Sequence, residues 1–535
     1  MKKFLLLVAS LLLIVLPLSG QELVEGEAEG NWWDGQVFYE IFVRSFYDSD
    51  GDGIGDIQGI IQQLDYLNDG DPTTTDDLGI TGIWLMPISP ATSYHGYDVL
   101  DYRGINPEYG TMADFEELLA EAEARGISIV VDLVINHSAR NHEWFLNSRE
   151  PGSPFEDWYV WSDEDPGYPG PDGQNVWHPF GGRYYYGVFW QGMPDLNYEN
   201  PEVTEEMYDI ARFWLEDVGV AGFRLDAIKF IIADGRAQEN TRQNLTWMAD
   251  FHDHVESVAP DALLVGEVWS NTGQISRYVD EQVDIAFEFD LAEAIIRTAQ
   301  FGTTGSVLRQ LETVYEAYPD GQYATFLTNH DQNRIMSQVA EDMDAATNAA
   351  SLLLTLPGVP FVYYGEEIGM TGIKPDEDIR LPMQWTGGPN AGFTTGTPWR
   401  PPAFNVTTVN VAAQDDDPDS LLNHYRGLIQ ARGASEAMRR GGFALLESSE
   451  RRMLAYLREY DGQAALVVLN LDDEPIESYT LTLAASGMTA VDAPTLLLGA
   501  GEVTAPTLND TGGFTDYTPV ATLPPTSATI IQLSE

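Results

Sequence analysis

Apolar and polar positions along this chain follow two spacings, one typical of buried strands and one typical of helices. Short, mostly apolar runs predict eight strands, at 37–42, 82–86, 127–134, 221–225, 263–267, 285–289, 323–328 and 359–364. Apolar residues three and four positions apart predict helices between several of them, at 112–125, 203–218 and 345–356. Eight alternating units predict an α/β fold of the parallel (β/α)8 TIM barrel type.

Two stretches break this alternation and predict further domains. Residues 138–196, after the third strand, are rich in Gly, Pro and Trp and too long for a plain loop, so we expect an inserted subdomain. Beyond a helical pattern at 421–432, strand-like runs predict a C-terminal antiparallel β-domain; they lie at 453–457, 464–469, 479–483 and 528–533. The expected division is a barrel at 32–137 and 197–435, the insert at 138–196 and a β-sandwich at 436–535.

The N-terminal segment has the pattern of a secretory signal. Lys2 and Lys3 precede an apolar run at 4–16, and Leu18-Ser19-Gly20 supplies small residues for cleavage. The run is short for a membrane span, with an uncleaved anchor as the alternative. We expect a signal peptide at 1–20, a flexible acidic lead-in at 21–31, and a secreted protein without a lipid anchor, since the chain has no cysteine.

The formal charge of −57 excludes several classes of partner. So acidic a surface repels nucleic acid and anionic membranes, and we expect neither as a partner. Lysine occurs only at positions 2, 3, 229 and 374. An acid-rich, lysine-poor surface suits a protein that stays hydrated in concentrated salt, so salt adaptation is one hypothesis and an ordinary acidic secreted protein is the other. We expect a monomer.

Acidic side chains follow predicted strands at the points where those strands reach the surface. The segments concerned are DLVINH (132–137), GFRLDAIK (222–229), LLVGEVW (263–269) and FLTNHD (326–331). Because the carboxyl ends of barrel strands meet on one face, Asp226, Glu267 and Asp331 are expected to lie together. Each alone would be an ordinary solvated carboxylate. As a set they suit glycosidic bond cleavage, which needs an acid for the departing oxygen and a carboxylate for the anomeric carbon.

Sequence neighbours assign different roles to two of these acids. Arg224 lies two positions before Asp226, faces the same way and is expected to keep that carboxylate ionised as the nucleophile. Glu267 lies between Val265 and Trp269, and this partly apolar setting would raise its pKa so that it holds the proton.

In order and spacing, the four segments resemble the diagnostic regions of glycoside hydrolase family 13, the α-amylase family, over nearly all of the mature chain. MPDLN (193–197) resembles the fifth region of members intermediate between oligo-1,6-glucosidases and neopullulanases. The resemblance implies a retaining mechanism on α-1,4-glucans such as starch and maltooligosaccharides. It implies Asp226 as nucleophile, Glu267 as acid/base, and Asp331 as a residue that binds sugar hydroxyls and favours ring distortion.

Further residues near the strand ends are expected to contact substrate. They are His95, Tyr97, His137, Arg224, Lys229 and His330. A neutral imidazole donates hydrogen bonds to sugar hydroxyls without adding charge, and the metal-ligand alternative lacks an HExxH spacing. The resemblance implies that the ring of Tyr97 faces the sugar at the cleavage point; the alternative for His95 and Tyr97 is a packed loop.

One segment, DSDGDGIGD, has the spacing of a loop that binds a hard cation. Its expected oxygen ligands are the side chains of Asp48, Asp50, Asp52 and Asp56 and the carbonyl of Ile54, and an acidic turn without metal is the alternative. The resemblance implies the calcium loop of oligo-1,6-glucosidase-like members, so Ca²⁺ is the expected cofactor. Asn136 matches a second calcium ligand of the family, although Phe230 stands where many calcium-dependent α-amylases have histidine.

The position three residues before Tyr97 separates internal from terminal cleavage within the family. Oligo-1,6-glucosidases carry an acid there that binds the non-reducing end, whereas this chain has Tyr94, as endo-acting α-amylases do. RLPMQW (380–385) and PNAGF (389–393) instead resemble glucosidases and trehalose synthases. We expect a secreted α-amylase that cleaves internal α-1,4 bonds. The alternatives are an α-glucosidase, an oligo-1,6-glucosidase, a neopullulanase-like hydrolase, a trehalose synthase-type isomerase and a non-catalytic sugar-binding relative, which can lose the acids kept here.

Overall fold

The computed structural model describes residues 30–279, 281–318, 321–491 and 493–534. The expected signal peptide and all but the last two residues of the expected lead-in lie outside these ranges. Within them, every helix is too short or too polar to cross a membrane.

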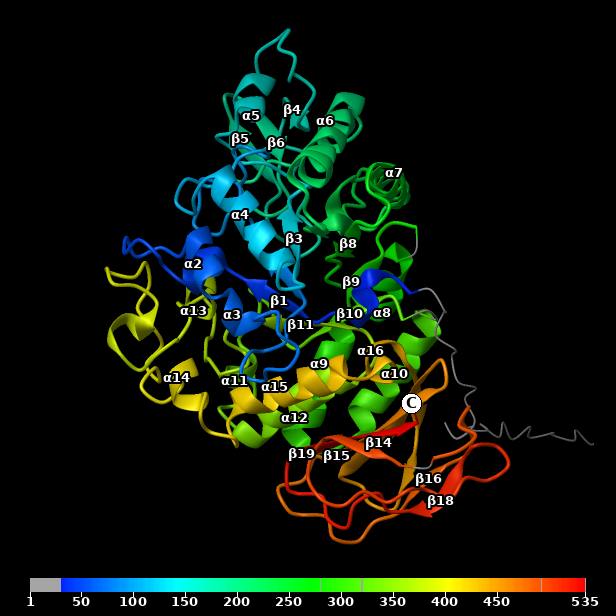
Figure 1. Ribbon diagram of the computed structural model, residues 1–535. Coiled ribbons are helices and arrows are strands. Elements are labelled where there is room, and N and C mark those ends of the chain that lie inside the picture. Colours follow the sequence, from blue (N-terminus) through cyan, green and yellow to red (C-terminus); the bar gives the residue numbers. More distant parts are fainter. Residues whose placement is uncertain (1–29, 280, 319–320, 492, 535) are drawn as a thin grey trace, which may run out of the picture.

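A closed barrel of eight parallel strands forms the centre of the molecule (Figure 1). In chain order the strands are β1 (Phe38–Ile41), β2 (Gly82–Leu85), β3 (Ser128–Leu133), β7 (Gly222–Leu225), β8 (Leu263–Gly266), β9 (Ile285–Phe287), β10 (Tyr323–Phe326) and β11 (Val359–Tyr363). All eight predicted strands are confirmed, each somewhat shorter than its apolar run. The strands read as continuous apolar runs because helices cover the outside and side chains fill the inside.

Helices surround this barrel and connect its strands. They are α1 (Val43–Phe46), α2 (Ile57–Gln62), α3 (Leu64–Leu67), α4 (Met112–Glu123), α5 (Glu143–Ser148), α6 (Pro201–Arg212), α7 (Arg242–Val258), α8 (Thr272–Ile275), α9 (Phe289–Phe301), α10 (Gly305–Ala317), α11 (Ile335–Gln338), α12 (Met343–Thr355), α13 (Asp376–Ile379), α14 (Val411–Gln414), α15 (Leu421–Gly433) and α16 (Glu436–Arg440). Local signals fix their starts: Thr111 and Asp114 cap α4 reciprocally, and Asn200 caps α6. Residues 203–218, predicted as one helix, form most of α6 followed by a π-helical segment at Phe213–Val218.

The insert after β3 is a small antiparallel sheet, at the top of Figure 1. Its strands, β4 (Trp161–Ser162), β5 (Trp177–Phe180) and β6 (Arg183–Tyr186), pair in the order β4-β6-β5. Aromatic rings hold it together; for example, Phe145 packs against both Trp161 and Tyr185. The predicted inserted subdomain is therefore confirmed.

The C-terminal domain consists of two antiparallel sheets, at the bottom of Figure 1. The larger contains β12 (Gly442–Leu445), β14 (Met453–Tyr460), β15 (Gln463–Asn470), β19 (Ser527–Ser534) and β17 (Thr495–Leu498), in that order. The smaller contains β13 (Glu447–Ser448), β16 (Leu481–Leu483) and β18 (Phe514–Tyr517). Leu466 and Ile531 of the first sheet and Leu481 and Phe514 of the second share one apolar core, which confirms the predicted β-domain.

Two buried arginines join this domain to the barrel. Arg458, on β14, donates hydrogen bonds to the carbonyls of Thr355 and Gly441 at 2.9 and 2.7 Å. Arg432, on α15, donates to the carbonyls of Leu354 and Leu356 at 3.1 and 3.2 Å. These carbonyls lie at or just beyond the C-terminal ends of α12 and α16, where a positive charge is favourable.

Replacing Arg458 by Ala should destabilise the junction, because buried carbonyls at two helix ends would lose their donors. We expect the free energy of unfolding to fall by about 2–4 kcal/mol, measured by denaturant unfolding. The exposed Arg451→Ala is the matched control. A loss in Arg458→Ala no larger than that in the control would show that these bonds do not stabilise the junction.

Candidate active site

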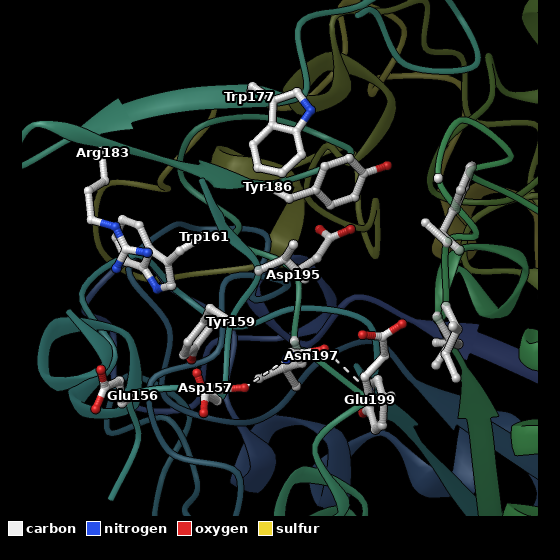
Figure 2. A pocket seen from close by; sticks show the side chains of 18 of the residues that line it. Glu156, Asp157, Tyr159, Trp161, Trp177, Arg183, Tyr186, Asp195, Asn197 and Glu199 are labelled. Carbon is white, nitrogen blue, oxygen red and sulfur yellow. Dashed lines mark hydrogen bonds between the residues drawn. The ribbon is translucent and has the colours of Figure 1, made fainter. Parts of the chain in front are cut away.

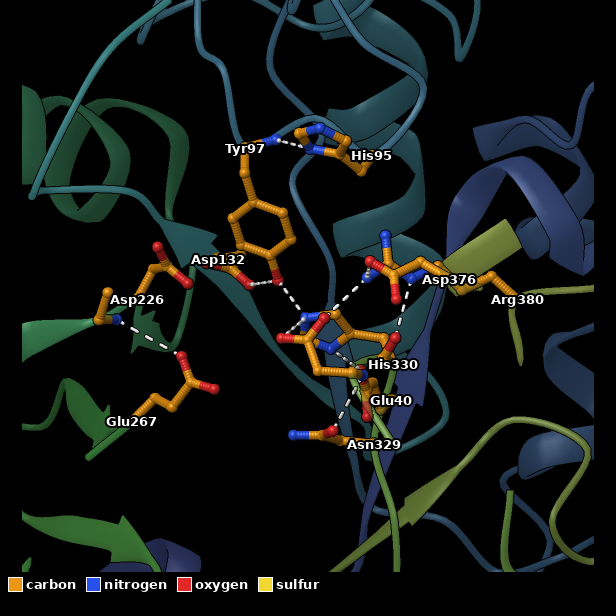
Figure 3. A network of polar contacts seen from close by, with 12 residues as sticks. Glu40, His95, Tyr97, Asp132, Asp226, Glu267, Asn329, His330, Asp376 and Arg380 are labelled. Atoms are coloured by element: carbon orange, nitrogen blue, oxygen red, sulfur yellow. Dashed lines mark hydrogen bonds and ion pairs between the residues drawn. The ribbon is translucent and has the colours of Figure 1, made fainter. Parts of the chain in front are cut away.

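Asp226, Glu267 and Asp331 lie just past the carboxyl ends of three barrel strands. The backbone of Asp226 donates a hydrogen bond to Leu133, and that of Glu267 donates to Leu225, so each acid extends the line of its strand. All three line one cavity of about 570 Å³. Figure 3 shows Asp226 and Glu267 side by side, facing Tyr97 and His330.

The Arg224 guanidinium contacts three carboxylates of the site. Its Nη1 donates to Asp132 Oδ2 and to Asp226 Oδ1, both at 2.8 Å. Its Nη2 lies 2.6 Å from Glu267 Oε2 in an ion pair. Arg224 is completely buried and its guanidinium lies over the ring of Trp84, 5.0 Å from the centroid. One cation thus orients three carboxylates.

Burial gives two of these acids different proton affinities from those in water. Burial raises the pKa of Glu267 to about 8, with Arg224 opposing and Asp226 adding to the rise. Burial also raises the pKa of Asp226, and the nearby positive charge of Arg224 only partly offsets it. The expected rise at Glu267 is found, and the expectation that Arg224 keeps Asp226 ionised stays a prediction.

A chain of buried polar groups supports the other side of the cavity. Tyr97 Oη donates to Asp132 Oδ2 at 2.9 Å and lies 2.7 Å from His330 Nε2. His330 Nδ1 lies 2.6 Å from Glu40 Oε1. Burial lowers the pKa of His330 well below its usual value and raises that of Glu40 well above its own. The ring of Tyr97 stacks with His330 at a centroid distance of 5.4 Å and with His95 at 6.0 Å, and these contacts hold it in place.

Asp331 has the opposite electrostatic setting from Glu267. Arg380 Nη2 donates to Asp331 Oδ1 at 2.8 Å. Burial alone would raise the pKa of Asp331, but the neighbouring His330 and Arg380 lower it to about 2. Arg380 also pairs with Asp376, which pairs in turn with Lys374 at 3.1 Å. Asp331 is therefore the acid that stays ionised most firmly.

The six residues expected to bind substrate fall into two groups. His95, Tyr97, His137 and Lys229 line the cavity. Arg224 and His330 are fully buried and do not line it, so they position other groups. Lys229 Nζ donates to the carbonyl of Trp269 at 2.9 Å and pairs with Glu239.

Sequence reasoning missed several participants. They are Glu40, Asp132, Phe189, Lys374, Asp376 and Arg380. A readable signal existed for two of them, since Glu40 and Asp132 are acids inside otherwise apolar strands, where an acid needs a specific partner.

The predicted cation loop brings three of its aspartates together. Side-chain oxygens of Asp48, Asp50 and Asp56 all lie within 4.8 Å of one another, and hard carboxylate oxygens suit Ca²⁺. Asp52 is not in this group; its carboxylate accepts a hydrogen bond from the backbone N–H of Ile54 at 2.8 Å. Gly53 has φ +100° and a Cβ there would lie 1.9 Å from the carbonyl of Thr397, so glycine lets the loop pack on residues 393–399.

Asn136 borders a second buried acid, Asp195, in the wall of a separate cavity of about 410 Å³ (Figure 2). Asn136 Oδ1 and Asp195 Oδ2 are buried acceptors without a hydrogen-bond partner in the described part of the chain. Burial raises the pKa of Asp195 to about 8. Two such oxygens suit a cation. Phe230, which lines the same cavity, has no side-chain oxygen or nitrogen that could bind one.

Comparison with known proteins agrees with this site. The catalytic domain profile of α-amylases matches residues 40–441, and that of the maltogenic amylase C-terminal domain matches 443–495. Alpha-amylase 3 of Dictyoglomus thermophilum is 41% identical over 448 residues, covering 82% of this chain and 85% of that protein. An oligo-1,6-glucosidase of Halalkalibacterium halodurans is 33% identical over 82% of this chain and 90% of its own length.

Among solved structures, the α-amylase from H. orenii superposes with a TM-score of 0.80 at 42% identity, covering 94% of this chain and 100% of that one. The likeness therefore extends over barrel, insert and C-terminal domain together. The protein belongs to glycoside hydrolase family 13, the α-amylase family, and is an α-glucan hydrolase.

Proposed function

We propose that the protein is an endo-acting α-amylase that hydrolyses internal α-1,4 bonds of starch and maltooligosaccharides with retention of configuration. The observation that carries this proposal is the shared guanidinium of Arg224, which holds Asp226 and Glu267 through its two terminal nitrogens. Two carboxyls on one guanidinium are close neighbours, and retaining glycosidases need a separation of about 5–5.5 Å.

Each acid then has a distinct task. Glu267, which keeps its proton near neutral pH, protonates the departing oxygen while the ionised form of Asp226 attacks the anomeric carbon. The Glu267 carboxylate next removes a proton from the water that cleaves the glycosyl–Asp226 ester. Asp331, ionised and fixed by Arg380, accepts hydrogen bonds from sugar hydroxyls. The face of Tyr97 carries the sugar ring.

The proposal of internal cleavage rests on Tyr94. Its ring lies nearly parallel to Trp399, with centroids 5.4 Å apart, and it brings no charge to this end of the site. Two carboxylates near Tyr94 are already paired, that of Asp376 with Lys374 and Arg380 and that of Glu377 with Arg400. A free acid that would bind a chain terminus is therefore replaced by an aromatic surface.

Secretion and calcium binding belong to the same proposal. A starch polymer is too large to enter a cell, so an enzyme that attacks it internally acts outside, as the N-terminal pattern at 1–20 predicts. Calcium in the 48–56 loop would tie residues 393–399, which include Trp399, to the start of the barrel.

Glu267→Gln should lower turnover on starch by about 10²–10⁴-fold, because the departing oxygen loses its proton donor. On substrates with good leaving groups, kcat/KM should be partly spared, because the first step then needs less protonation. In the unmodified enzyme, kcat/KM on starch should fall as pH rises through about 8, where Glu267 loses its proton, and this decline should vanish in the variant on activated substrates.

The matched variant Asp226→Asn should lose activity on both substrate types, since it removes the nucleophile. Full starch activity in Glu267→Gln would reject the acid assignment.

Tyr94→Asp should move the enzyme towards short substrates, because a buried carboxylate that accepts sugar hydroxyls selects for a chain end. The unmodified enzyme should abolish the iodine colour of amylose before much reducing sugar appears. Release of glucose alone at the earliest times by the unmodified enzyme would favour the α-glucosidase alternative instead.

Removing calcium should lower the melting temperature, because an ion held by the folded loop stabilises it by mass action. The comparison is a thermal scan with and without excess chelator, with metal analysis of the purified protein. Asp50→Asn should weaken the response to chelator, whereas Asp71→Asn, in another exposed acidic turn, should not. Equal melting temperatures with and without chelator would remove calcium from the proposal.

A further inference from the structure

One buried acid beside the active site, Glu40, has no task in the chemistry described so far. It lies on β1, where all four residues are buried and the surroundings favour an apolar side chain. Only 2% of Glu40 is exposed, and a buried carboxyl is costly unless a specific partner binds it. That partner is His330, whose Nδ1 lies 2.6 Å from Glu40 Oε1 (Figure 3).

The hydroxyl of Tyr97 shows where His330 carries a proton. This hydroxyl has one proton of its own, which it donates to Asp132 Oδ2 at 2.9 Å. Asp132 accepts because it is a carboxylate, bound by Arg224 Nη1 at 3.0 and 2.8 Å. His330 Nε2 lies 2.7 Å from the same hydroxyl oxygen, and two acceptors at that distance would repel each other. Nε2 of His330 therefore carries a proton and donates it to Tyr97.

Glu40 satisfies the other nitrogen of the same ring. With a proton on Nε2, a neutral imidazole has a bare Nδ1 that needs a donor, and an imidazolium has a second N–H that needs an acceptor. A protonated Glu40 meets the first need and an ionised Glu40 meets the second. In both cases one proton lies between Glu40 Oε1 and His330 Nδ1, and Nε2 keeps its own.

Packing alone does not determine which nitrogen faces Tyr97. The imidazole of His330 lies between the rings of Trp84 and Tyr97, at centroid distances of 5.6 and 5.4 Å. These contacts fix the plane of the imidazole, but turning the ring over within the same space would preserve them. The hydrogen bond to Glu40 distinguishes the two orientations, because only one of them places Nδ1 beside the carboxyl.

We propose that Glu40 is a positioning residue that holds the His330 imidazole with a proton on Nε2 and so directs the hydroxyl of Tyr97 to Asp132. The inference rests on the proposed function, in which the ring of Tyr97 carries the sugar. Tyr97 is thereby connected to Arg224 twice, through Asp132 and through a hydrogen bond from Nη1 at 3.3 Å. An acid on β1 thus holds a residue of the loop that follows β2.

The first test locates the proton in the unmodified enzyme. With nitrogen-15-labelled histidine, NMR should show His330 with a proton on Nε2, and the signal is identified by its loss in His330→Asn. A His330 without a proton on Nε2 would overturn the inference. This measurement needs neither substrate nor a variant of Glu40, so it decides the inference even where the proposed function fails or Glu40→Leu does not fold.

The second test compares two replacements of the same carboxyl. Glu40→Leu should lower kcat on soluble starch about ten-fold, because buried Nδ1 loses its partner and the imidazole no longer holds the Tyr97 hydroxyl. Glu40→Gln should recover most of this loss, since its amide N–H can donate to Nδ1 without any charge. An equal loss of kcat in the two variants would contradict the proposed role.

A double-mutant cycle with Tyr97→Phe separates positioning from a purely structural role. In the Tyr97→Phe background, Glu40→Leu should lower kcat by less than about three-fold, because no hydroxyl remains to be directed. The control is Glu367→Leu, which removes an equally buried carboxyl that binds the hydroxyls of Tyr39 and Tyr66; its effect should be the same in both backgrounds. Effects of Glu40→Leu and Tyr97→Phe that simply multiply would overturn the inference. An unmodified enzyme without activity on starch would instead overturn the proposed function.

Discussion

The buried guanidinium of Arg224 is the interaction on which the active site depends. Asp132, Asp226 and Glu267 would repel one another and favour water, and each meets the same cation at 2.6–2.8 Å. Strand register makes this possible, since Asp132 on β3 lies directly beside Arg224 on β7. Asp226, two positions further on, faces the same way as Arg224. The barrel therefore fixes the acids through backbone pairing before any substrate arrives.

The acids around Arg224 differ widely in their pKa values. Glu267 is buried and Asp331 half-buried, and the pKa of the first is about 8 whereas that of the second is about 2. The difference comes from geometry. Glu267 shares its single cation with other acids, whereas Asp331 has Arg380 hydrogen-bonded to it and His330 beside it. Environment alone thus divides acid catalysis from charge stabilisation among chemically similar groups.

Much of the fold could be predicted because its signals are local. Buried parallel strands appear as apolar runs, and the acids of the site follow those runs directly. What could not be predicted depends on contacts between distant loops. Asp376 and Arg380 come from a segment without a strand, and β17 and β18 are short and half exposed, so no periodicity marked them. The charge balance at Asp226 depends on burial depth, which a sequence does not state.

The buried arginines have a consequence beyond the junction that two of them form. Arg224, Arg334, Arg380, Arg432 and Arg458 are all buried, in a chain with only 27 lysines and arginines against 84 acids. Their positive charges lie in the interior, so fewer cationic side chains remain on the surface, beside the acids there, than the composition suggests. The surface is therefore even more strongly anionic than the composition suggests. Dissolved ions should therefore act first on hydration and on contacts between molecules, and least on the catalytic centre.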